Sequence, residues 1–329
     1  MSTRTREETS GPLGVIGCLA AGFEILGRHL WLVILPVLLD LLLWLGPRLS
    51  IAPLLEGFVA LLTAQPAPDP TTARQVTQAV QLLKQFGEQF NLFSLLSALP
   101  LLNVPSLLAR HTPGAVSPLG EPRALLVTNV LVLMAWIAAL VIVGLAMGFL
   151  YLNGLAHRVR AMHSPTPALP HFSGVGKLIR VFSFAISLLM SGTVFTSLWL
   201  LLTAITAAIV QPLGFIVWAL GVGLGGYAAM HLLFVVHGIL LGERGLLRAA
   251  WESIVLIHTQ LPSVIGLVVL AMVIYEGLGF VWSLPSGDSW LLLVGILGNG
   301  CIATGLTAAT FVFYQERIAS TNERGTGSG

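Results

Sequence analysis

The stretch MHLLFVVHGILLGERGLLRAAWESIVLIHTQLPSVIG, residues 230–266, decides the fold of this chain. An apolar segment ends at Leu241, the chain turns at residues 242–245, and a short amphipathic piece follows before Pro262 opens the next apolar run. Apolar residues recur in this piece at spacings of three and four, which is typical of a helix with one apolar stripe. They are Leu246, Leu247, Ala250, Ile254 and Ile257. The stretch predicts a surface helix between two membrane-spanning helices that return to the same side of the bilayer.

The polar residues of this interfacial helix are Arg248, Glu252, Ser253 and His258. Residues 15–28 repeat the pattern, because Glu24 and Arg28 lie off an apolar stripe of helical spacing. We therefore expect two amphipathic helices along the cytoplasmic membrane surface, the first of them directly before the first span.

The composition excludes a soluble globule. Hydrophobic residues make up 56% of the 329 residues and charged residues only 9%, which leaves too little polar surface to cover a folded domain of this size. The apolar runs show no alternation with a period of two, so the backbone is expected to satisfy its hydrogen bonds in helices rather than in a barrel. A net charge of +2 gives no argument for a nucleic-acid partner.

These patterns predict an all-α, polytopic membrane helix bundle with about six transmembrane helices, since a span takes about 20 apolar residues. The expected spans are residues 30–46, 125–152, 181–210, 213–241, 261–282 and 290–314. The chain is divided into a flexible N-terminus (1–14), the first interfacial helix and span (15–46), an extracytoplasmic helical insertion (47–123), spans two to six (124–315) and a disordered tail (316–329).

Within the insertion, residues 71–90 predict an amphipathic helix. Residues 92–108 are apolar, but Pro100 and Pro105 interrupt them, which favours an interfacial or re-entrant segment over a span.

The basic residues predict the orientation. Most of them fall on one face of the predicted topology, including a basic loop at 156–176, and the short connections on the other face have none. By the positive-inside rule, we expect a multi-pass protein of the cell (inner) membrane with both termini in the cytoplasm.

Two passages carry a resemblance to a known family. LAAGFEILGRHLW (residues 19–31) and GERGLLRAAWES (242–253) resemble the membrane domain fused to some bacterial glycerophosphodiester phosphodiesterases and related stand-alone six-span bacterial membrane proteins. The resemblance implies that Ser253 is the family's serine in the cytoplasmic helix, and that residues 313–317 match its closing pattern. The chain lacks the soluble phosphodiesterase domain, so hydrolase activity is not expected.

Four ionisable residues fall inside predicted spans, where such groups are candidates for function. Asp40 and Glu276 lie at similar depth and could form a cation or proton site. In the alternative, favoured interpretation, Asp40 pairs with Arg48 or reaches the interface, and Glu276 caps or hydrates a helix end.

His231 and His237 are six residues apart, which places them on different helix faces. They could ligate a haem or chlorophyll, but no other span offers a partner histidine, so a structural role is favoured. With Cys18 and Cys301 as the only cysteines, we expect no metal and no cofactor.

Glycines in the fourth and sixth spans predict close helix packing rather than a phosphate-binding loop, because they are embedded in apolar helices. They are Gly221, Gly223, Gly225, Gly226, Gly295, Gly298, Gly300 and Gly305.

No arrangement of residues in the sequence indicates a nucleophile with a positioned base. We therefore expect a non-enzymatic integral membrane protein, a structural, accessory or lipid- or partner-binding component. Its expected partners are membrane lipids and a membrane protein or a second copy of the chain. The alternative is a transporter or channel that uses Asp40 and Glu276.

Overall fold

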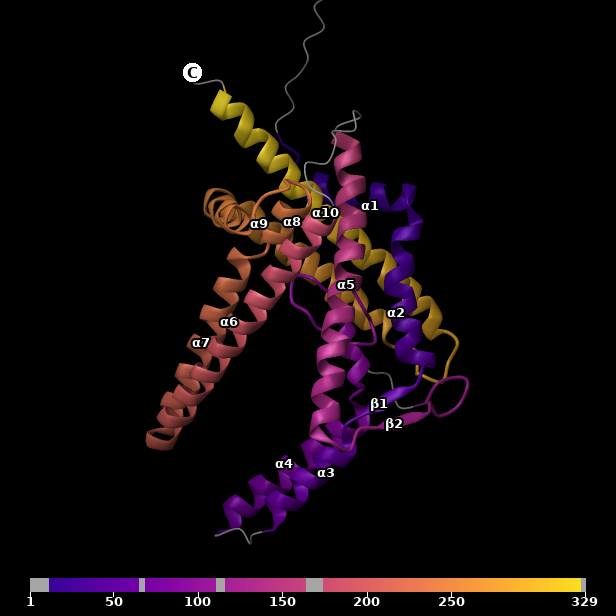
Figure 1. Cartoon of the computed structure of the whole chain (residues 1–329), viewed down its shortest axis with the longest axis vertical. Coiled ribbons are helices and arrows are strands. Elements are labelled where there is room, and N and C mark those ends of the chain that lie inside the picture. Colours follow the sequence, from indigo (N-terminus) through magenta and orange to yellow (C-terminus); the bar gives the residue numbers. More distant parts are fainter. Residues whose placement is uncertain (1–11, 65–68, 111–115, 164–173, 327–329) are drawn as a thin grey trace, which may run out of the picture. The chain divides into compact units, whose positions relative to one another are not determined.

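The computed structural model describes residues 12–64, 69–110, 116–163 and 174–326, and most of them are helical (Figure 1). In chain order the elements are α1 (Val15–Arg28), η1 (Leu30–Val33), α2 (Ile34–Leu45), β1 (Arg48–Ser50), α3 (Ala52–Thr63), α4 (Pro70–Gln89), η2 (Leu92–Ser97), β2 (Ala124–Leu126), α5 (Val130–His163), α6 (Gly174–Ile209), α7 (Gln211–His231), α8 (Val235–Leu240), α9 (Leu246–Trp282) and α10 (Leu292–Thr326). The predicted all-α class is confirmed, apart from the short pair β1–β2.

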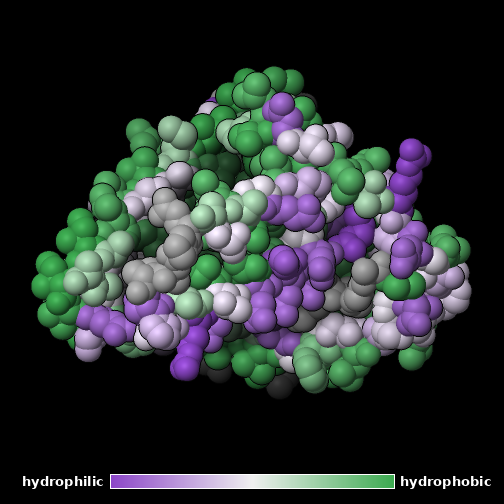
Figure 2. Space-filling view, turned by 90° about the horizontal axis from the view of Figure 1, so that it is seen from below, coloured by the Kyte–Doolittle hydropathy of each residue, from purple (hydrophilic) through white to green (hydrophobic). Residues whose placement is uncertain are grey.

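Within the described residues, five stretches are long and apolar enough to cross a membrane, which is compatible with a multi-pass membrane protein. They are Val130–Met162, Gly174–Ile209, Gln211–Leu240, Leu246–Trp282 and Leu292–Ala319. A sixth is added if Val15–Arg28 and Leu30–Leu45 count as one broken span. On the face shown in Figure 2, hydrophobic residues cover much of the surface, with hydrophilic residues at several places among them.

Several helix ends in the structure differ from the predicted ones. Helix α5 continues to His163, so the described beginning of the expected 156–176 loop is helical, whereas residues 164–173 lie outside the described part. Helix α10 runs to Thr326, where a disordered tail was expected from residue 316. Contacts explain part of this order, because Glu316 accepts a hydrogen bond from the Leu13 amide at 3.2 Å and Arg317 donates to the Leu13 carbonyl at 3.3 Å. Most of the expected flexible N-terminus, residues 1–11, lies outside the described residues.

The chain forms two compact units. The first holds residues 1–28, 152–271 and 305–329, and the second holds residues 29–151 and 272–304.

In the first unit, α1 packs closely on α10 because a glycine stands on each side of the contact. A Cβ on Gly22 would lie 2.6 Å from the Gly305 carbonyl oxygen, and a Cβ on Gly305 would lie 2.5 Å from the Phe23 ring. Helices α6 and α7 form a hairpin (Figure 1), in which the Trp199 indole N–H donates to the Val217 carbonyl at 2.7 Å. The predicted helix-packing role is thus confirmed for Gly305.

The other glycines divide into two groups. Gly221 meets the Trp199 side chain, Gly295 and Gly298 meet Trp282, and Gly300 meets Val33, while an added Cβ on Gly225 would lie 3.5 Å from the Phe195 ring. Around Gly223 and Gly226, by contrast, no described atom lies within 4 Å of an added Cβ, so they make no close helix contact in this structure.

In the second unit, the insertion is closed at its base by β1 and β2, which pair in parallel with Arg48 opposite Ala124. Helices α3 and α4 lie side by side beyond this pair (Figure 1). Helix α4 covers the predicted 71–90 helix, and Asp69 caps it by accepting hydrogen bonds from the amides of Thr71 and Thr72 at 2.8 and 2.9 Å. The hydrogen bonds from Thr72, first its backbone N–H and then its hydroxyl, hold the pKa of Asp69 below its ordinary value.

Candidate functional site

Asp40 lies on α2, is fully buried, and binds a loop of the insertion. Its carboxylate accepts a hydrogen bond from the Ser106 hydroxyl at 2.5 Å and from the backbone amides of Leu107 and Leu108 at 3.0 Å each. Because a buried charge needs such donors, these three hydrogen bonds are what makes a carboxylate tolerable at this position. The expected pairing of Asp40 with Arg48 is therefore wrong, because Arg48 donates to the Glu88 carbonyl instead.

Glu276 binds the same loop a few residues further on. Arg110 donates from Nη1 to the Glu276 carboxylate at 2.5 Å, and its guanidinium lies 4.6 Å from the centre of the Tyr275 ring. Glu276 was expected to cap or hydrate a helix end, and the structure shows it in this ion pair with Arg110 instead of capping a helix. Asp40 and Glu276 thus share one structural target, which we name the 106–110 loop.

The predicted re-entrant segment follows a compact path before it reaches this loop. After η2 it has no regular helix, and most of its apolar side chains are buried, with Val104 fully so and Leu102 and Leu107 nearly so. It reaches α5 at two glycines, since a Cβ on Gly144 would lie 3.0 Å from the Leu96 carbonyl oxygen. At Gly148 a Cβ would clash outright with the Leu102 carbonyl.

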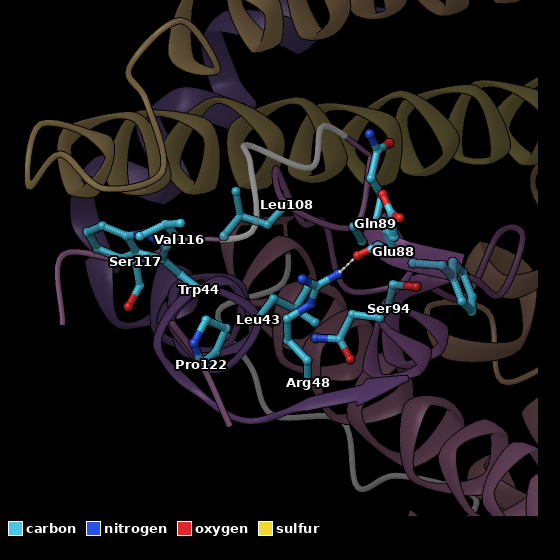
Figure 3. Close-up of a pocket in the computed structure, with 13 residues that line it drawn as sticks. Leu43, Trp44, Arg48, Glu88, Gln89, Ser94, Leu108, Val116, Ser117 and Pro122 are labelled. Carbon is cyan, nitrogen blue, oxygen red and sulfur yellow. Dashed lines mark hydrogen bonds between the residues drawn. The ribbon is translucent and has the colours of Figure 1, made fainter. Parts of the chain in front are cut away.

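A cavity of about 320 Å³ opens beside the 106–110 loop (Figure 3). Its walls combine apolar side chains with a few polar ones: Leu43, Trp44, Arg48, Glu88, Gln89, Phe90, Asn91, Ser94, Leu108, Ala109, Val116, Ser117 and Pro122. Arg48 reaches across it and donates a hydrogen bond to the Glu88 backbone carbonyl. A cavity of this size with mainly apolar walls and a few polar groups is typical of a small-molecule site.

The loop that is hydrogen-bonded to Asp40 also forms part of the wall of this cavity. Leu108, whose amide donates to Asp40, forms part of the cavity wall, and Ala109 beside it forms another part. Trp44 lies one turn beyond Asp40 on α2, and its indole N–H donates to the Gly287 carbonyl at 2.7 Å. The buried carboxylate of Asp40 therefore positions one wall of the cavity.

The two histidines of the predicted fourth span are separated by a break between α7 and α8. Nδ1 of His231 lies 2.8 Å from the Tyr227 carbonyl oxygen, and its ring centre lies 5.0 Å from that of His258. Nε2 of His237 lies 2.9 Å from the Thr310 hydroxyl. The two side chains contact different elements, and the described residues contain no group of three or more His, Cys, Asp or Glu suited to a metal ion.

Ser253, in the N-terminal part of α9, stabilises the break between α7 and α8. It is fully buried, accepts a hydrogen bond from the Phe234 amide at 3.2 Å and donates one to the His231 carbonyl at 2.7 Å. These are backbone groups that the interrupted helix leaves without their usual partners. A non-helical conformation at Gln260 separates this part of α9 from the rest, close to the position where the sequence predicts a change from surface helix to span.

The buried face of this surface helix differs from the predicted stripe. The fully buried or nearly buried residues are Ala249, Ser253, Leu256 and Ile257, whereas Leu247 is 86% exposed. Close packing decides this, because Ala249 lies against Gly238, where an added Cβ would be 3.1 Å from the alanine Cβ. The side of the helix that carries Ala249 and Ser253 thus faces the protein and Leu247 faces outward, a choice that apolar periodicity alone does not reveal.

Glu243 is a centre of ionic contacts that the sequence analysis missed. It has a φ of 52°, and its carboxylate binds Arg160 Nη1 at 3.0 Å and Lys177 Nζ at 2.9 Å. Burial alone would raise its pKa, but the hydrogen bonds and positive charges of Lys177 and Arg160 hold that pKa at about 2. The available signal was a single carboxylate in the turn 242–245, in a chain whose predicted cytoplasmic loops are basic.

Glu252 is shared in a similar way. Its Oε1 lies 3.2 Å from Nε of Arg244 and 3.0 Å from Nε of Arg248.

Comparison of this chain with known protein families, with curated proteins and with solved structures finds no match.

Proposed function

We propose that this chain is a non-enzymatic membrane component that binds a lipid-like amphiphile in the cavity of its insertion. The observation that carries the proposal is the mixed wall of that cavity, where Trp44, Phe90 and Leu108 offer apolar surface. Arg48 and Glu88 supply one cationic and one anionic side chain at the same cavity. An acyl chain suits the first set, and a polar headgroup suits the second.

The contacts of Asp40 and Glu276 favour a lipid-binding protein over a transporter. A transported cation needs carboxylate oxygens that can exchange partners, whereas Asp40 is held by three donors and Glu276 by Arg110. Both groups are engaged in holding the 106–110 loop. The proposed role in the membrane also fits the resemblance of residues 19–31 and 242–253 to a membrane domain rather than to a hydrolase domain.

The proposal is tested by filling the cavity with a larger side chain and measuring how much lipid remains bound to the purified protein. The full chain is purified in a mild detergent, and co-purifying lipid is quantified by mass spectrometry for the unaltered protein and for Ser94→Phe, because Ser94 lines the cavity. We expect a stoichiometric lipid on the unaltered chain and loss of most of it on Ser94→Phe. Ser191→Phe on exposed α6 is the matched control and keeps the lipid.

Equal lipid on the unaltered chain and Ser94→Phe would contradict the proposal. Proton or cation flux in proteoliposomes that Asp40→Asn or Glu276→Gln abolishes would favour the transport alternative instead. Headgroup analysis of the bound lipid then identifies the class of amphiphile.

A further inference from the structure

A group of cations in the first unit surrounds the turn 242–245. We name it the basic cluster, and it consists of Arg160, Lys177, Arg180, Arg244 and Arg248. These residues stand at the end of α5, in the first turns of α6, in the turn itself and in the first turn of α9. Each of these places is the end of a stretch long and apolar enough to span a membrane, so the basic cluster lies where a bilayer would meet water.

The basic cluster carries more positive charge than its carboxylates neutralise. Glu243 is shared by Arg160 and Lys177, and Glu252 is shared by Arg244 and Arg248. Arg180 donates to the backbone carbonyls of Glu243 and Arg244, both at 3.2 Å. Among the described residues of this cluster, five cations therefore stand against the two carboxylates Glu243 and Glu252, which leaves an excess of positive charge.

The surface next to this charge is apolar. Leu247, Trp251 and Val255 follow one another at spacings of four along α9 and are 86%, 67% and 41% exposed. The Arg248 side chain beside them is 67% exposed. An exposed aromatic and aliphatic row flanked by arginine is typical of a helix that lies in the membrane interface.

We propose that this surface binds an anionic phospholipid, with the headgroup phosphate at Arg244 and Arg248 and the acyl chains along Leu247 and Trp251. Charge complementarity selects this occupant, because a second copy of the same surface would bring like charge against like. An apolar row gives no contact to free phosphate, so a lipid explains both parts of the surface. The site belongs to the first unit and is separate from the cavity of the insertion.

The experiment measures lipid selectivity by native mass spectrometry of the full chain in detergent, titrated with phosphatidylglycerol or phosphatidylcholine. We expect tighter binding of phosphatidylglycerol, and about fivefold weaker binding for Arg248→Gln, since one basic residue near an anionic surface contributes about 1 kcal/mol. Trp251→Ala should weaken both lipids. Arg74→Gln on α4 is the control and should leave the selectivity unchanged.

Three results would overturn the proposal: equal binding of the two lipids, selectivity unchanged in Arg248→Gln, or displacement of the lipid by millimolar inorganic phosphate. Arg248 and Trp251 are exposed, so neither substitution removes a buried contact. Ser94→Phe should retain the phosphatidylglycerol selectivity, which separates this site from the one proposed in the insertion.

Discussion

At the scale of single residues, Glu243 has the clearest consequence for stability. Its pKa is held at about 2, below its ordinary 4.5, so the ionised form is the one that the fold stabilises. This contribution is present above about pH 4.5 and is lost as the pH falls toward 2, because protonation releases Lys177 and Arg160. We expect Glu243→Gln to lower the free energy of unfolding at neutral pH by on the order of 3 kcal/mol.

The measurement is thermal unfolding in detergent, at neutral pH and again near pH 3. The difference between Glu243→Gln and the unaltered chain should shrink at the lower pH. Glu56→Gln, on the exposed part of α3, serves as control and should match the unaltered chain at neutral pH. A difference for Glu243→Gln that does not change with pH would show that the ion pairs are not its source.

At the scale of elements, the contact between the re-entrant segment and α5 depends on glycine. A Cβ at Gly148 would occupy the position of the Leu102 carbonyl oxygen, so Gly148→Ala must push the segment away from the helix. We expect a loss of about 1–3 kcal/mol, as for other overpacked sites. Gly192→Ala on α6 is the matched control, because no described atom lies within 4 Å of its added Cβ. Equal unfolding midpoints for the two variants would refute this account of the contact.

The sequence predicts the elements better than their contacts. Helix α1 begins and ends where apolar periodicity places it, at Val15 and Arg28, because helical spacing is a local property. The partners of Asp40 could not be predicted, since they lie 66 to 68 residues away in the sequence. Two of them are backbone amides, which nearly every residue type has, so the sequence does not mark them.

The outward face of the surface helix escaped prediction for a related reason. Leu246 to Ile257 contains apolar residues on more than one side, so hydrophobicity alone fits more than one orientation. The choice depends on which side is small enough to pack closely, and Ala249 against Gly238 settles it. The local pattern of apolar residues thus predicts that a helix forms, whereas the sizes of the side chains on each side determine which side packs against the protein.

At the scale of the whole molecule, the span count and the charges make a testable topology. From the insertion, one span leads through α5 to Met162, and two more, α6 and the pair α7–α8, lead to the turn before Arg248. Met162 and Arg248 should therefore share one side of the membrane, and Leu119 in the insertion should lie on the other. By the positive-inside rule, the basic residues around Arg248 lead us to expect that this shared side is the cytoplasmic one.

Single cysteines at these three positions, in a chain with Cys18 and Cys301 replaced by alanine, test the assignment in intact cells. The side chains of Met162, Leu119 and Arg248 are 42%, 71% and 67% exposed, so a cysteine there is accessible to a reagent. A membrane-impermeant maleimide should label Leu119→Cys before permeabilisation, and Met162→Cys and Arg248→Cys only after it. Labelling of Met162→Cys and Arg248→Cys from opposite sides would require that one of the two stretches between them, α6 or α7–α8, does not cross the bilayer. The interfacial placement of the surface helix, and with it the proposed phospholipid site, would then fail.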